Sequence, residues 1–211
     1  MCNSPDSKPG PAPALQRIAL CLQYNGSAFC GWQRQDNAPS VQERLDQAIA
    51  ELDPHRPVHT VAAGRTDTGV HAAAQVVHFD AAGPIPPQRW AKALNGRLPS
   101  TIRVRAAAAV APDWHACYGA SYRRYRYTIL NARTPNLFLA PWSWHRYQQR
   151  LDDQARCRAA LLETPGFDDV ETGGEIHLPG GRTATWQGKI EATSVSDLFA
   201  VQLTAETEPP D

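Results

Sequence analysis

Apolar and polar residues alternate along several short segments of the chain, and this period of two is typical of half-buried strands. The pattern is clearest at residues 17–24 (RIALCLQY), which precede a loop rich in Gly, Asn and Pro. It predicts further strands at residues 57–65, 73–80, 101–110 and 121–130. Residues 181–206 predict a closing hairpin that turns near Ser196–Asp197.

Other segments show the helical period of 3.6 residues. Residues 40–52 begin with an S-x-x-E capping box, Ser40 and Glu43, and continue with an apolar stripe. Residues 87–98 predict a second helix, and a third is expected near Asp152–Leu162. Strands and helices mixed without a strict βαβ alternation predict an α+β fold, built on a mostly antiparallel sheet flanked by helices.

The composition is that of a water-soluble globular protein. The 211 residues are 42% hydrophobic, enough for one sizeable core or two small fused ones. A membrane span is excluded because no run of about 18 apolar residues occurs. Residues 1–16 lack the apolar centre of a secretory signal and predict a disordered arm rich in Pro and Ser. Five scattered cysteines without a CxxC pair favour a reducing, cytoplasmic location.

The net charge of zero hides an asymmetry along the chain. Residues 1–150 carry 17 Lys and Arg against 9 Asp and Glu, a charge of +8, whereas residues 151–211 carry 4 against 12, a charge of −8. A basic body suits a surface that faces nucleic acid, although solvated charges that merely cancel explain the counts equally well.

The segment between the second and third predicted strands, Gly64–Ala72 (GRTDTGVHA), concentrates polar chemistry in a short turn. An aspartate close before a turn glycine most often caps the turn with its side chain, which is the ordinary interpretation of Asp67. Three features favour a functional one. Arg65 can stabilise the ionised carboxylate or contact a phosphate, the two glycines allow close approach of a ligand, and His71 adds a titratable group.

The predicted strand 121–130 interleaves tyrosines and arginines. Strand alternation places Arg123, Tyr125, Tyr127 and Ile129 on one face and Tyr122, Arg124, Arg126 and Thr128 on the other. A core position is the favoured interpretation for Tyr127. Tyr125 stays open between a core aromatic and a platform on which a base stacks.

The loop Asp113–Tyr118 (DWHACY) before that strand can be a hydrophobic plug on the sheet or a wall around a flipped base. The histidines do not indicate a metal site. His71 and His78 are too far apart for a helical i, i+4 pair, and no carboxylate–histidine cluster has the spacing of metal ligands.

Several segments together resemble the tRNA pseudouridine synthase A family. They are YNGSAFCGWQRQ with SVQERLDQAI, AAGRTDTGVHAAAQVVHFD, LNGRLP, and WHACYGASYRRYRYTILN, and they cover about Arg17 to Leu162. The resemblance implies an isomerase that converts uridine to pseudouridine in the anticodon stem-loop of tRNA, without cofactor or metal. It also implies a homodimer, and a pseudouridine-synthase-like fold of two RRM-like lobes with the active-site cleft between them.

The resemblance assigns roles to individual residues. Asp67 matches the catalytic nucleophile, Arg65 the residue that helps to flip the target base, and Tyr125 the tyrosine stacked on the uracil. The positions that match RNA contacts are Trp114, His115, Ala116, Cys117, Tyr118 and Arg133. We expect an N-terminal arm at 1–16, an N-terminal synthase lobe at 17–110 and a shortened C-terminal lobe at 111–211.

The family pattern fades after Leu162, and residues 167–170 and 182–191 echo it only faintly. The family continues with an apolar N-A-F-x-H-H-M-V-R-N helix, whose arginine pairs with the catalytic aspartate. No residue of this chain matches that arginine, and Arg182 or Lys189 are the candidates to replace it. We therefore expect a C-terminally shortened, divergent member. Two alternatives stay open: a catalytically degenerate RNA-binding relative or fragment, and, more distantly, a metal-dependent hydrolase built on Asp67 and the histidines.

Overall fold

The computed structural model describes residues 15–54, 56–146, 173–177, 183–192 and 198–207. The chain divides into two compact units, Met1–Gly119 and Ala120–Asp211, and each is described by itself. The domain boundaries expected from the sequence, at residues 16 and 110, stay predictions.

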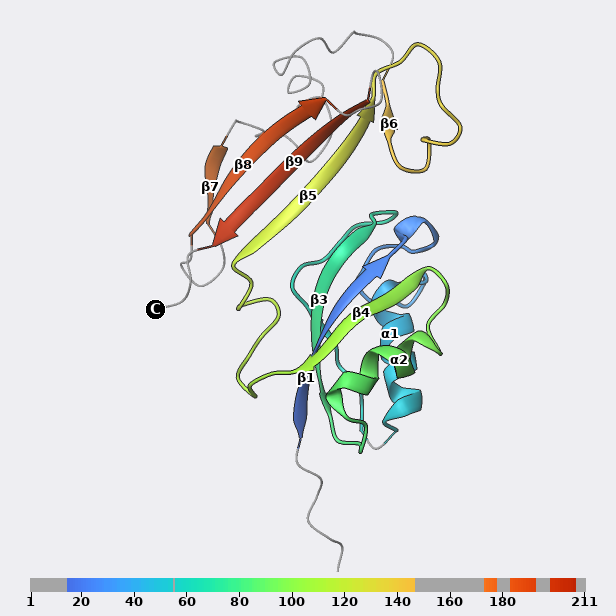
Figure 1. Cartoon of the computed structure of the whole chain (residues 1–211), viewed down its shortest axis with the longest axis vertical. Helices are drawn as coiled ribbons and strands as arrows, with labels where there is room; N and C mark the ends of the chain where they lie inside the picture. Colours follow the sequence, from blue (N-terminus) through green and yellow to red (C-terminus); the bar gives the residue numbers. More distant parts are fainter. Residues whose placement is uncertain (1–14, 55, 147–172, 178–182, 193–197, 208–211) are drawn as a thin grey trace, which may run out of the picture. The chain divides into compact units, whose positions relative to one another are not determined.

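The first unit contains a four-stranded antiparallel sheet with the strand order β2-β3-β1-β4 (Figure 1). The strands are β1 (Gln16–Tyr24), β2 (Val61–Ala62), β3 (Ala72–Ala81) and β4 (Ile102–Ala109). β1 is central, so that Leu20 lies opposite Val77 of β3 on one side and Ala107 of β4 on the other. The strands predicted at 17–24, 73–80 and 101–110 are therefore confirmed.

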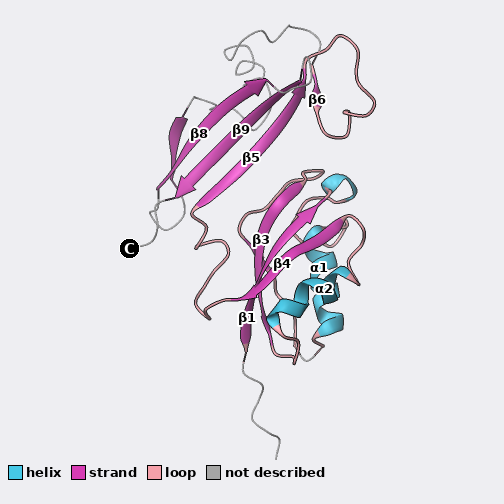
Figure 2. Cartoon of the chain, in the orientation of Figure 1, coloured by secondary structure: helices cyan, strands magenta, loops and turns pink. Residues whose placement is uncertain are grey.

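Two helices, α1 (Val41–Leu52) and α2 (Trp90–Asn95), cover one face of this sheet (Figure 2). The predicted cap of α1 is confirmed, because the Ser40 Oγ accepts a hydrogen bond from the Glu43 N–H at 3.2 Å. The second predicted helix is shorter than expected. It starts as the 3-10 turn η2 (Pro87–Arg89), and α2 ends at Asn95, before Gly96.

The core lies between the sheet and the helices. Every second residue of β1 points into it, and Ile18, Leu20 and Leu22 are each no more than 1% exposed. They pack in one cluster with Val77 and Phe79 of β3, Leu45 and Ile49 of α1, and Trp90 and Leu94 of α2. Burial of a side chain of this size stabilises the fold by about 1.5–3 kcal/mol, so this face fixes the register of β1.

The length of the strand predicted at 57–65 is wrong, because only Val61–Ala62 pairs with β3. The residue before it is bonded to α1 instead of to a strand. Gln42 donates from Nε2 to the Thr60 carbonyl at 2.9 Å, and the Thr60 hydroxyl donates to Asp46 Oδ1 at 2.6 Å. These bonds draw Thr60 to the helix, so that the strand begins after it.

The second unit contains a five-stranded sheet with the order β6-β5-β9-β8-β7. Its strands are β5 (Tyr122–Leu130), β6 (Trp144–His145), β7 (Gly173–His177), β8 (Thr183–Ala192) and β9 (Leu198–Thr207). All neighbours are antiparallel except β5 and β6. The predicted closing hairpin is confirmed by β8 and β9, whereas the predicted turn and the helix expected near Asp152–Leu162 lie outside the described residues.

The two sheets agree with the predicted α+β class and its mostly antiparallel pairing. None of the helices in the described part of the chain combines the length and hydropathy needed to cross a bilayer.

Candidate active site

Residues 64–71 lie in the turn between β2 and β3, and Ala72 begins β3. Arg65, Asp67 and Thr68 are exposed on this turn, whereas Thr66 points back toward the protein and is only half-buried. The structure records no ion pair between Arg65 and Asp67, both of which it describes. The turn thus presents a carboxylate and a guanidinium to solvent as separate groups.

The residues before α1 hold the backbone of this turn in place. The Trp32 N–H donates to the Thr66 carbonyl at 2.9 Å, and the Gly69 N–H donates to the Phe29 carbonyl at 3.2 Å. The hydroxyls of Tyr24 and Thr66 share a further hydrogen bond of 2.8 Å. Because Tyr24 and Trp32 are 4% and 2% exposed, the turn is bonded to residues that the core itself fixes.

Glycine is required where the loop and the turn meet. Gly31 has a φ of +90°, and a Cβ at this position would lie 2.7 Å from the Thr66 carbonyl oxygen. Any other residue would therefore be strained by its own backbone and would also push the turn away. Gly69 has a φ of +79° and turns the chain directly after Asp67 and Thr68.

The hydrogen bonds of the turn bear on the two interpretations of Asp67. A capping aspartate would accept from the amides two or three residues further on. Here the Gly69 N–H is bonded to the Phe29 carbonyl, and the Val70 N–H is bonded to the backbone carbonyl of Asp67 at 3.2 Å. The turn is thus closed without the Asp67 carboxylate, which favours the functional interpretation of this side chain.

His71 ends the turn, and its ring makes a bond within the protein. Its Nδ1 accepts a hydrogen bond from the Gly26 N–H at 3.1 Å. Gly26 begins the short 3-10 helix η1 (Gly26–Ala28) in the loop that holds the turn. The sequence indicated His71 as a hydrogen-bonding group, and the structure identifies this partner.

The predicted RNA-contacting loop, Trp114–Tyr118, lies on the sheet face opposite the helices. The Ala116 N–H donates to His78 Nδ1 at 3.2 Å, and Arg17 Nη1 donates to the Trp114 carbonyl at 3.0 Å. The His78 ring also contacts the rings of Trp114 and His115, with centroid distances of 5.9 and 4.8 Å. The loop is therefore anchored to β1 and β3 in the first unit.

Burial and neighbouring charge control the protonation of this anchor. Burial lowers the pKa of His78 to about 4, and the charges of His115 and Arg17 lower it in the same direction. The pKa of His115 is also lowered, first by burial and then by Arg17. His78 is thus neutral near pH 7, as its Nδ1 must be to accept the Ala116 N–H.

The loop and the turn lie at opposite ends of β3 (Figure 1). His78 is six residues after Ala72, which corresponds to about 20 Å along a strand. This length describes only where the loop is anchored along β3, and the two interpretations of the loop, a hydrophobic plug and a wall around a flipped base, stay predictions. Within the loop, Tyr118 is 68% exposed and stacked on His115 at 4.2 Å, whereas Ala116 is only 2% exposed.

The remaining predicted site residues, Tyr125 and Arg133, belong to the second unit. Tyr125 lies in β5 and is 38% exposed, and Arg133 is exposed in the loop that follows. Tyr127 is also 38% exposed, so its expected core position is wrong. The described residues of this unit form strands and loops only, with no helix there to cover β5.

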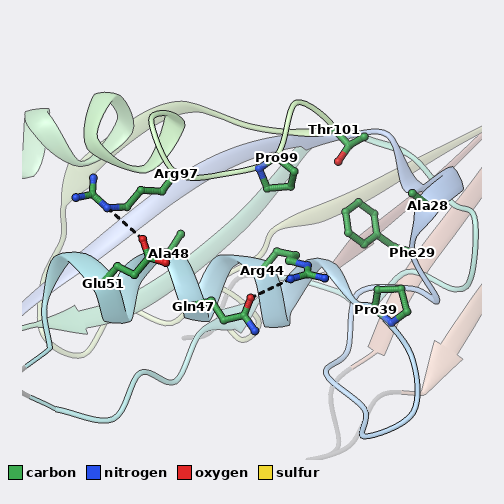
Figure 3. Close-up of a pocket in the computed structure, with 10 residues that line it drawn as sticks. All are labelled: Ala28, Phe29, Pro39, Arg44, Gln47, Ala48, Glu51, Arg97, Pro99 and Thr101. Atoms are coloured by element: carbon green, nitrogen blue, oxygen red, sulfur yellow. Dashed lines mark hydrogen bonds and ion pairs between the residues drawn. The ribbon is translucent and has the colours of Figure 1, made fainter.

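A separate groove lies between α1 and the segment after α2 (Figure 3). Arg44 Nη1 donates to Gln47 at 3.2 Å along it, and Arg97 pairs with Glu51 at 3.4 Å. The groove meets the loop before α1 at Phe29 but contains neither Asp67 nor Arg65. Among the described residues, no three His, Cys, Asp or Glu side chains lie together as metal ligands would.

Comparison with known proteins places this arrangement in a family. The family model for tRNA pseudouridine synthase matches residues 20–119. The tRNA pseudouridine synthase A of Synechococcus sp. (strain CC9605) is 68% identical over 207 residues, which is 96% of this chain and 69% of the relative. The chain belongs to the tRNA pseudouridine synthase A family. Its likeness to this relative continues through the acidic region beyond Leu162, where the motifs fade.

Other members of the family give the same picture. The enzyme of Parasynechococcus marenigrum (strain WH8102) is 55% identical over 97% of this chain and 68% of its own length. That of Prochlorococcus marinus (strain MIT 9303) is 66% identical over 90% of this chain and 64% of its own length. The chain thus spans about two thirds of these relatives. The family model covers the turn, the loop that holds it and the Trp114–Tyr118 loop, and it ends before Tyr125.

Sequence reasoning missed the residues that hold the site in place. Tyr24, Trp32 and Thr66 carry bonds to or from the turn, and His78 anchors the distant loop. His78 did carry a signal, because it is a polar residue inside the apolar strand segment VVHF. The partners of Thr66, Tyr24 and Trp32, had no such signal, because they lie in a segment far from Thr66 in the sequence.

Proposed function

We propose that this chain is a tRNA pseudouridine synthase that isomerises uridine in the anticodon stem-loop of tRNA. The observation that carries the proposal is the Asp67 carboxylate, which is exposed on a turn that other bonds already close. Asp67 lies in the G-R-T-D-x-G-V-H motif of a chain that belongs to the tRNA pseudouridine synthase A family. Both facts support a role for this carboxylate as the nucleophile of the isomerisation.

The reaction needs a nucleophile and no external reagent. The N1–C1′ bond of uridine breaks, the uracil turns over, and a C5–C1′ bond forms. The proton on C5 leaves and N1 gains one, so that atoms and charge balance. The Asp67 carboxylate can add to the sugar or the base and be released unchanged when the new bond forms.

The target base must first leave its stack, at a cost of a few kcal/mol by general estimate. Arg65, two residues from Asp67, would help to flip the base and fill the space that it leaves. Tyr125 would offset part of the cost by stacking on the uracil, a role that its partly exposed ring permits. The residues Trp114–Tyr118 and Arg133 would contact other parts of the tRNA.

The finer features of the family resemblance stay part of the proposal. They are two RRM-like lobes with a cleft between them, base flipping, a homodimer, and a cytoplasmic location. The arginine that pairs with the catalytic aspartate also has no assigned counterpart. Lys189 lies in β8 opposite Gln202 of β9, and Arg182 lies outside the described residues.

The test is to identify and map the product. An unmodified tRNA transcript is incubated with the chain in the presence of a metal chelator, and pseudouridine is located by chemical mapping. Wild type should modify the anticodon stem-loop and Asp67→Ala should not. The control is Asp36→Ala, which removes another exposed aspartate and should keep the activity. Binding of tRNA by the wild type without product would instead indicate a catalytically degenerate relative.

A further inference from the structure

The bond between His71 and Gly26 closes a ring of contacts around the turn that carries Asp67. The Gly26 N–H donates to His71 Nδ1, and the Gly26 carbonyl accepts from the Phe29 N–H at 2.9 Å. The Phe29 carbonyl in turn accepts from the Gly69 N–H. Gly69 and His71 belong to the same turn, two residues apart. The turn and η1 are therefore joined at two points, one on each side of Val70.

The fit at this junction is tight. Gly26 is buried, and a Cβ at this position would overlap the Val70 carbonyl oxygen. Because the Gly26 N–H is enclosed, losing its acceptor would leave a buried donor unpaired. We expect η1 to move to regain a partner, and this movement would shift the Phe29 carbonyl that holds Gly69.

We propose that His71 is a positioning residue for Asp67, and that it acts by accepting the Gly26 N–H and so locking η1 against the turn. This inference rests on the proposed catalytic role of Asp67. The bond requires a lone pair on Nδ1, so a neutral ring carries its proton on Nε2. His71 is thereby assigned a role as an acceptor within the protein.

A competing role is proton transfer to the substrate, since the histidine lies in the same motif as the nucleophile. The two roles predict different responses to substitution. The Oδ1 of asparagine is attached to Cγ, as Nδ1 is in histidine, so it can accept the same N–H. The Oε1 of glutamine is one carbon further away. Neither amide can take up or release a proton near neutral pH.

The experiment compares His71→Asn, His71→Gln and His71→Leu with wild type. The control, His59→Asn, changes an exposed histidine before β2. Three quantities are measured for each variant: the rate of pseudouridine formation at saturating tRNA, the dissociation constant for tRNA, and amide hydrogen exchange at Gly26 and Gly69. Thermal unfolding identifies any variant that does not fold, and the Asn and Gln pair carries the test if His71→Leu is lost.

Positioning predicts a selective loss of rate. His71→Leu and His71→Gln should lower the rate by up to about 100-fold, a loss that a 1 Å misplacement at an active site can cause. Their dissociation constants for tRNA should stay near the wild-type value, while Gly26 and Gly69 exchange faster. His71→Asn should retain most of the rate and the protection, and His59→Asn should match wild type.

Two results would overturn the inference, and a third would instead overturn the proposed function on which it rests. If His71→Asn is as slow as His71→Leu although it protects Gly69, the histidine moves protons or binds substrate. If all variants turn over at the wild-type rate, the contact does not position Asp67. If the wild type itself makes no product, the proposed function fails. In that case amide hydrogen exchange still tests whether His71 locks η1 against the turn. Unchanged protection of Gly69 in His71→Leu would contradict this.

Discussion

The Asp67 carboxylate stands on a turn whose amides are bonded to other groups, and this separates it from an ordinary turn aspartate. The Gly69 N–H is bonded to the Phe29 carbonyl, and the Val70 N–H to the Asp67 carbonyl. The side chain is therefore exposed on a backbone that its neighbours hold. A fixed backbone favours catalysis, because the nucleophilic oxygen is already close to its reactive position when the substrate binds.

Gly31 shows how strictly one residue can be required for this support. Gly31→Ala should destabilise the protein by about 1–3 kcal/mol, since alanine is strained at a φ of +90° and its Cβ would press on the Thr66 carbonyl. The measurement is the free energy of unfolding in urea. The matched control is Gly96→Ala, where φ is −77° and the nearest contact of a Cβ is 3.5 Å. Equal stability of the two variants would contradict this account of the loop.

At the scale of elements, the loop on the far end of β3 depends on a neutral histidine. His78 Nδ1 accepts from the Ala116 N–H, and burial lowers the pKa of His78 to about 4. In the unfolded chain the pKa of a histidine is near 6.5. The unfolded state therefore binds more protons between these two values, and stability rises with pH across this window.

This difference predicts a specific loss of stability in acid. The contribution of His78 should be complete above pH 6.5 and should disappear as the pH falls through about 4. It is measured as the free energy of unfolding against pH for wild type and His78→Asn, which has no titrating ring. His115 and Asp80, which face His78, are present in both proteins. Parallel curves between pH 6.5 and 4 would show that His78 is not the group responsible.

The elements that the sequence predicts well are those whose signal lies within one segment. β1 alternates along its own length, and α1 carries its cap at Ser40 and its apolar stripe within thirteen residues. The shortness of β2 could not be predicted, because it depends on the bonds between Thr60 and α1. The support of the candidate site is of the same kind, since Gly26 and His71 are 45 residues apart.

At the scale of the whole molecule, charge and family favour the same partner. Residues 1–150 carry a charge of +8, and this part includes Asp67, Arg65 and Tyr125. A basic surface attracts a polyanion such as RNA and speeds its encounter with the protein. The acidic residues 151–211 balance the total charge, which is why the composition alone does not indicate an RNA-binding protein.

The most direct test follows the hydrogen that the reaction must remove. A tRNA transcript carrying tritium at C5 of its uridines is mixed with wild type or with Asp67→Asn, which keeps the shape of the side chain but replaces the nucleophilic carboxylate with a neutral amide. We predict that wild type releases tritium to water and that Asp67→Asn binds the tRNA equally well but releases none. Release by Asp67→Asn at the wild-type rate would contradict the role of Asp67, and no release by either protein would contradict the proposed reaction.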